Sequence, residues 1–140
     1  MTPAEREARW ALLVRFAIEA ADQAEARAIL DRALASLDRE LPLAGEPTIA
    51  PLRIRDSIWV AMLAPDLTVL ASVEPDDARN RCRYVSSHFG VGVTWTSRHT
   101  QQGERWDWPP DIWSRSQGDD ALLHPAVQAV MITCEDRGAH

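Results

Sequence analysis

The feature that most constrains the fold is an alternation of apolar side chains over residues 10–19. Its even positions are Trp10, Leu12, Val14, Phe16 and Ile18, and its odd positions are Ala11, Leu13, Arg15, Ala17 and Glu19. A period of two residues is typical of a β-strand whose two faces meet different surroundings. The pattern therefore predicts a strand over residues 10–19.

The surrounding stretch, residues 3–41, also admits a second interpretation, one long helix. Thr2 and Glu5 have the spacing of a helix-capping pair, and neither glycine nor proline occurs between Pro3 and Leu41. Asp22 and Glu25, however, form a second capping pair, which indicates that a new helix begins there. A single helical stripe follows, formed by Ala26, Leu30, Ala33, Leu34, Leu37 and Leu41. We favour a strand followed by a helix.

The rest of the chain suggests two more pairs of elements. Strands are expected over residues 52–55 and 58–64, with a turn at Asp56 and Ser57. A helix should start near Pro75 and end at Gly90, burying Ala78, Cys82, Val85 and Phe89. Strands are also expected over residues 91–98 and 126–135. Residues 99–125 show no regular period, and we expect an irregular segment there.

The resulting order is β-α-β-β-α-β, followed by the irregular segment and an extra C-terminal strand. This order resembles the ferredoxin-like sandwich, an α+β fold with two helices on one face of an antiparallel sheet. The length of 140 residues suits one domain spanning residues 1–140. A fold resemblance carried by element order alone implies no function.

Charge excludes some classes of function. The net charge is −6, and neither end of the chain is basic, so the counterion release that drives general nucleic-acid binding has no source. The same balance argues against docking on anionic lipid, and no apolar run approaches the length of a membrane span. All 15 basic residues are arginine, which excludes Schiff-base and P-loop lysine chemistry.

The cysteines and histidines give no sign of a metal site or cofactor. Cys82 and Cys134 do not form a CxxC pair, and none of the four histidines has zinc-ligand spacing. Both cysteines fall at apolar positions, so we expect buried, reduced thiols that react slowly. The charged N-terminus lacks a signal-peptide core, and we expect a cytoplasmic protein without metal or cofactor.

The irregular segment, residues 99–125, is rich in tryptophan and is the main candidate for a functional region. Its indoles can pack on the sheet as ordinary core, form an interface, or line a pocket. Polar groups nearby could converge on a ligand. The candidate ligand or interface residues are Trp106, Trp108, Trp113, Arg98, His99, Asp107, Asp111 and His124. By contrast, Arg79, Arg81 and Arg83 are interpreted as a solvated helix face, because acids precede them at helical spacing.

Two hypotheses about function follow. Residues 58–63 and 127–134 are apolar on both faces, whereas two helices would cover only one face of the sheet. Something must then cover the other face, either the Trp-rich segment of the same chain or a second subunit. The first hypothesis is therefore a non-catalytic protein that associates with itself, as a homodimer, or with another protein, through its sheet face and Trp-rich segment. The second is an enzyme or small-ligand binder with a cleft between the sheet and the Trp-rich segment.

Overall fold

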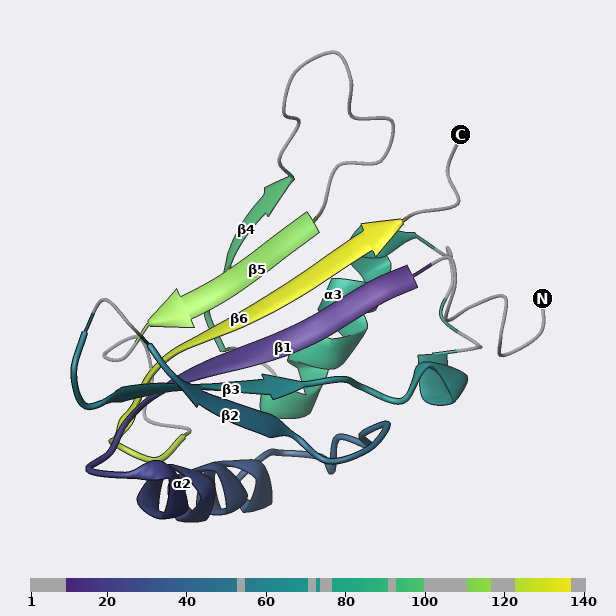
Figure 1. Cartoon of the computed structure of the whole chain (residues 1–140). Coiled ribbons are helices and arrows are strands. Elements are labelled where there is room, and N and C mark those ends of the chain that lie inside the picture. Colours follow the sequence, from purple (N-terminus) through teal and green to yellow (C-terminus); the bar gives the residue numbers. More distant parts are fainter. Residues whose placement is uncertain are drawn as a thin grey trace.

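A six-stranded antiparallel sheet dominates the part of the chain described by the structure, a computed structural model (Figure 1). The described residues are 10–52, 55–70, 73, 77–90, 93–99, 111–116 and 123–136. The strands lie in the order β2-β3-β1-β6-β5-β4. Their bounds are β1 Trp10–Glu19, β2 Thr48–Pro51, β3 Ile58–Leu63, β4 Thr96–His99, β5 Asp111–Ser116 and β6 Val127–Asp136.

Strand β1 lies between β3 and β6 and confirms the strand-then-helix interpretation of the N-terminal stretch. It covers residues 10–19, as the alternation predicts. Helix α2 (Gln23–Ala35) begins directly after the cap residue Asp22, whose carboxylate accepts a hydrogen bond of 2.8 Å from the backbone N–H of Glu25. The capping pair therefore marks the true helix start.

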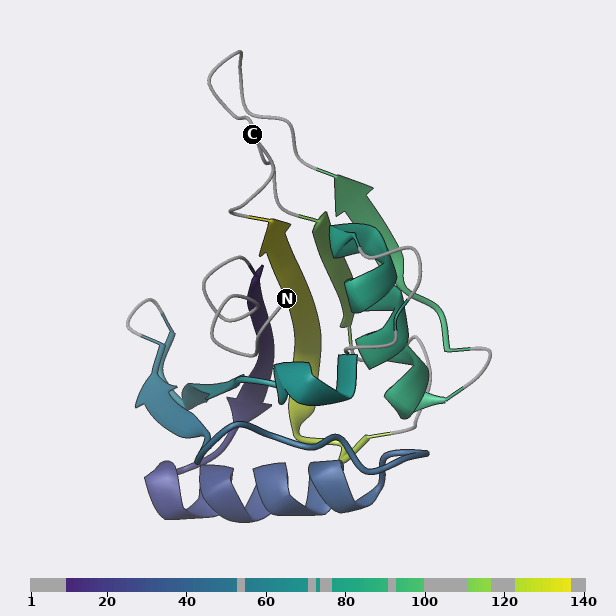
Figure 2. The same cartoon turned by 90° about the vertical axis from the view of Figure 1, so that its right-hand side faces the viewer.

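Both helices bury their apolar sides in one core with the even residues of β1. Helix α3 (Ala78–Ser86) packs on β6 and β5, and α2 packs near β1, β2 and β3 (Figure 2). Short 3₁₀ turns lie at Leu67–Leu70 and Ser87–Phe89. The predicted stripe of α3 is largely confirmed: Cys82, Val85 and Phe89 are buried, and Gly90 follows with a φ of 125°.

The first strand of the β2-β3 hairpin lies earlier than the sequence suggested. The expected strand over residues 52–55 is wrong at its two described residues: neither Leu52 nor Arg55 is in a strand, and the backbone N–H of Arg55 donates a hydrogen bond of 3.2 Å to the carbonyl oxygen of Leu52. Residues Thr48–Pro51 pair with β3 instead. The predicted turn at Asp56 and Ser57 is confirmed, and Ser57 takes a positive φ of 66°.

The segment expected to be irregular contains a strand. Residues Asp111–Ser116 form β5, which pairs with β6 on one side and β4 on the other. Its polar residues hide the alternation, because the core-facing positions opposite Cys134 and Val130 are Asp111 and Arg115. Strand β4 covers only Thr96–His99, and residues 93–95 before it are not extended strand as expected.

The α+β class is confirmed, but the strand order differs from the four-stranded ferredoxin-like sheet. Strand β6, expected as an addition at the end of the fold, lies next to β1 inside the sheet. Strands β5 and β4 extend the sheet beyond it. The physical reason is the buried backbone of β6, a strand of ten residues: its N–H and C=O groups point to both edges, and the pairings with β1 and β5 provide their hydrogen-bond partners.

Candidate functional site

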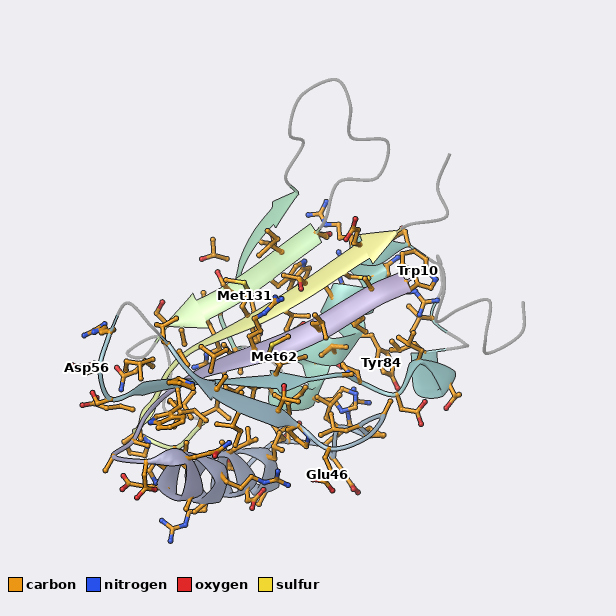
Figure 3. All side chains as sticks on the ribbon, in the orientation of Figure 1. Trp10, Glu46, Asp56, Met62, Tyr84 and Met131 are labelled. Atoms are coloured by element: carbon orange, nitrogen blue, oxygen red, sulfur yellow. The ribbon has the colours of Figure 1, made fainter. Side chains whose placement is uncertain are left out.

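The face of the sheet opposite α3 is the candidate functional site, and we call it the open face. Figures 1 and 3 show it toward the viewer, with α3 behind the sheet. None of the described helices packs on it. The odd residues of β1 belong to this face, because the even residues are buried in the helical core.

Two methionines and an arginine form the central row of the open face. The register places Arg15 of β1 directly between Met62 of β3 and Met131 of β6. Met62 is 38% exposed and Met131 is 39% exposed, and they are the most exposed large apolar side chains among the described residues. Figure 3 shows both labels over the middle of the sheet. Unbranched methionine side chains are adaptable contact groups and are frequent on binding surfaces.

Half-buried side chains continue the open face on both sides of this row. On one side Ala17 pairs with Val60 and Ala129, which are small or β-branched. On the other side lie Leu13 and its neighbours on β6 and β5, Thr133 and Ile112. All six are partly accessible to solvent. The centre of the face is therefore a continuous, mostly apolar area.

Among the side chains that the structure describes, charged groups on the open face are few and separated. The guanidinium of Arg15 lies toward β6, where it donates a hydrogen bond of 3.5 Å to the hydroxyl oxygen of Thr133. Glu19 is exposed at the end of β1, and its carboxylate accepts a hydrogen bond of 3.3 Å from the side-chain amide of Gln128. Glu135 is half-buried near the other end of the face. One cation thus lies in the apolar centre, with acids toward both ends of β1.

The structure does not gather the polar candidates from the sequence into one site. Asp111 is 2% exposed and pairs with Cys134 near the end of β6, on the α3 side. His124 lies just before the start of β6, and its Nδ1 accepts a hydrogen bond of 3.0 Å from the backbone N–H of Ala126. Of the two β4 candidates, His99 pairs with Asp111, and Arg98 pairs with Ile112.

The tryptophan candidates are only partly covered by the described residues. Trp113 is half-buried on the helical side of β5 and packs against the core, opposite Ile132. Trp106, Asp107 and Trp108 lie outside the described residues. The expectation that at least two of the three indoles are buried therefore stays a prediction.

A buried polar cluster lies between α3 and the end of the sheet. The interpretation of α3 as a solvated arginine face is wrong for Arg81, which is 1% exposed and lies over the ring of Trp10 at 4.4 Å from its centroid. Arg79 and Arg83 are exposed as expected. Helical spacing suggested three equivalent arginines, but the central one points into the core.

The two cysteines belong to the same region and confirm the expected burial. Both are free thiols with no exposed surface. The thiol of Cys82 donates a hydrogen bond of 3.6 Å to the backbone carbonyl oxygen of Asp111. The hydrogen bond to Cys134, together with burial, raises the pKa of Cys82 well above its ordinary value. Since thiolates are the reactive form, this site suppresses reactivity.

A pocket of about 330 Å³ lies at the end of β1 beside the 3₁₀ turn at Leu67. Its lining is Trp10, Ala11, Leu12, Leu13, Ala44, Ala64, Pro65 and Leu67. None of these described side chains carries a titratable group. In the described ranges, moreover, no three His, Cys, Asp or Glu side chains gather as metal ligands.

The sequence predicts that the sheet has a second apolar face, but it does not indicate the residues that define the open face. Arg15, Met62 and Met131 were not among the site candidates. The signal was present in the odd positions of β1 and the even positions of β3, but the register that joins them across three strands could not be obtained from the sequence.

Comparison with protein families, curated proteins and solved structures gives no match. No helix among the described residues is long and apolar enough to cross a membrane. A function for this chain therefore has to be argued from the geometry of the open face and its chemistry.

Proposed function

We infer that this chain is a non-catalytic interaction protein that associates with a second copy of itself through the open face. The observation that carries this proposal is the central row, in which two exposed methionines flank Arg15 on a face that no described helix covers. Apolar surface exposed in this way favours association, at about 25 cal/mol for each Å² removed from water.

A related proposal concerns the fold. The order β2-β3-β1-β6, with α2 after β1 and α3 after β3, supports a ferredoxin-like unit extended by β5 and β4. In such a unit the helices cover one face only, which agrees with the single helical core. The extension widens the uncovered face to six strands, or about 24 Å at the usual strand spacing.

The composition of the face supports a contact with another protein surface. A standard protein interface removes about 800 Å² from each partner. The apolar area extends over β3, β1, β6 and β5, with charged groups few at the centre, and that composition is typical of interface cores. A second copy presents the same apolar area and is therefore a chemically matched partner.

The proposal can be tested by sedimentation equilibrium on the full-length protein and the Met131→Glu and Met62→Glu variants. We expect the wild type to be dimeric at micromolar concentration. Each variant places a carboxylate beside Arg15 in the apolar row, and this charge must lose its water when the faces associate, so the dissociation constant should rise about 100-fold or more. The matched control is Ala28→Glu on the exposed side of α2, which should leave the dissociation constant unchanged.

Two results would contradict the proposal. One is a monomeric wild type over the full concentration range, which would point to a cover from the same chain or to a different protein. The other is a dimer that Met131→Glu, Met62→Glu and the control affect equally. Circular dichroism of each variant in its monomeric form separates loss of association from loss of folding.

A further inference from the structure

The open face carries opposite charges at positions that a two-fold axis can exchange. Arg15 and Glu19 lie on the same strand and the same face, with Ala17 midway between them. Their Cα atoms are separated by four residues, about 13 Å at the usual rise of a strand. Arg15 is half-buried in the apolar centre, and Glu19 is exposed at the end of the strand.

A two-fold axis that lies between two stacked sheets, perpendicular to their strands, reverses the direction of each strand. If it crosses β1 at Ala17, each Arg15 faces Glu19 of the other copy, and each Glu19 faces the other Arg15. Sheets that pack face to face keep their strands within about 30° of each other, so residues near the axis stay opposed.

The row of residues along this axis suits a close approach of two sheets. Register aligns Ala17 with Val60 and Ala50 on one side and with Ala129 on the other. These side chains are short or β-branched, and the longer Met62 and Met131 lie in the next row, beside the axis rather than on it. Each methionine can then fill space against the other copy without blocking contact at the centre.

Other positions of the axis are less favourable. An axis through the central row would oppose Arg15 to its own copy, and like charges buried together are destabilising. An axis through Leu13 would bring Arg15 near Glu135, but that carboxylate is half-buried and already engaged within its own chain. Glu19 has one long hydrogen bond, 3.3 Å from Gln128, and is exposed.

We propose that the dimer is an antiparallel stack of two open faces with its two-fold axis at Ala17, held in register by two symmetric Arg15–Glu19 ion pairs. The inference rests on the proposed self-association and adds its geometry. The apolar centre supplies affinity, and the ion pairs select one register among several that the apolar side chains would allow.

The test is a charge exchange, measured by sedimentation equilibrium. Arg15→Glu or Glu19→Arg alone places like charges opposite each other twice in the dimer, and each should weaken association about 100-fold. The double variant Arg15→Glu/Glu19→Arg restores both pairs, so its dissociation constant should return to within about threefold of wild type. Glu135→Arg, a reversal on the same face away from the axis, should change association less than about threefold.

A second measurement does not depend on charge. Ala17→Cys places a thiol on the axis, where it faces its own copy, and a short bis-maleimide should cross-link it in high yield. Ala28→Cys on the exposed side of α2 is the control and should cross-link poorly. Both native thiols are buried and should not compete.

The outcomes separate the geometry from the self-association on which it rests. If Met131→Glu abolishes the dimer but the double charge variant stays as weak as the single ones, the open face associates with a different register, and this inference is overturned. Rescue of Arg15→Glu by Glu135→Arg would place the axis at Leu13 and also overturn it. A monomeric wild type would overturn both proposals.

Discussion

Among single residues, His88 couples folding to pH. Its side chain is 4% exposed and lies edge-on to the ring of Tyr84, with centroids 5.4 Å apart. Burial lowers the pKa of His88 below its ordinary value of 6.5, and the nearby Arg39 guanidinium lowers it further. Below pH 6.5 the unfolded chain therefore binds a proton that the folded protein does not.

We predict that this difference makes the protein less stable as the pH falls from 7 to 5.5. The His88→Phe variant fills similar space without a titrating ring, so its free energy of unfolding should fall less over the same range. Urea denaturation at several pH values measures the difference. Tyr84→Phe keeps an aromatic ring edge-on to His88 and is the control, so its curve should run parallel to that of the wild type. Parallel pH curves for wild type and His88→Phe would refute the assignment.

Single residues also show which features of the fold the sequence predicts and which it does not. The caps at Asp22 and Gly90 and the alternation in β1 are local signals, and the structure confirms each of them. The burial of Arg81 and Asp111 depends on which distant groups the fold brings to them. No local spacing contains that information, since an arginine at helical spacing from an acid is usually solvated.

At the scale of elements, the docking of α3 on the sheet depends on Arg81. The guanidinium lies 4.4 Å from the centroid of the Trp10 ring and is almost fully buried, so it joins α3 to the start of β1. A desolvated cation–π contact is worth about 2 kcal/mol, and removing a buried charged side chain disrupts its surroundings further. Helix α3 is therefore held by more than its apolar stripe.

We predict that Arg81→Ala lowers the free energy of unfolding by about 3 kcal/mol. Arg79→Ala, on the exposed side of the same helix, should change it by less than about 0.5 kcal/mol. Urea denaturation followed by circular dichroism gives both values. Equal effects of the two substitutions would mean that the contact with Trp10 contributes nothing to docking.

Element by element, the sequence predicts strands with apolar alternation better than strands with polar core positions. Strands β1, β3 and β6 were found because their apolar residues alternate or run continuously. Strand β5 was missed because Asp111 and Arg115 occupy core-facing positions that are normally apolar. Its place in the sheet is set by pairing with β6, a long-range contact that sequence periodicity does not report.

At the scale of the whole molecule, the two thiols report on folding and association together. Cys82 belongs to α3 and Cys134 to β6, and neither has exposed surface. The hydrogen bond with Cys134 and burial raise the pKa of Cys82, so little thiolate forms in the folded state. A labelling reagent therefore reaches them only when the core opens.

We predict that a maleimide reagent labels both native thiols about 1,000-fold more slowly than in urea-unfolded protein, because opening the core requires most of the free energy of unfolding. If the open faces are stacked in a dimer, opening also requires dissociation, so labelling should slow further as protein concentration rises. The Met131→Glu variant, in which we expect association to be about 100-fold weaker, should lose that concentration dependence while it keeps slow labelling. Rapid labelling of the wild type would show that the thiols are not sealed in the core. Slow labelling at a rate independent of concentration would mean that the stacked dimer contributes nothing to stability, and the open face would then need another partner.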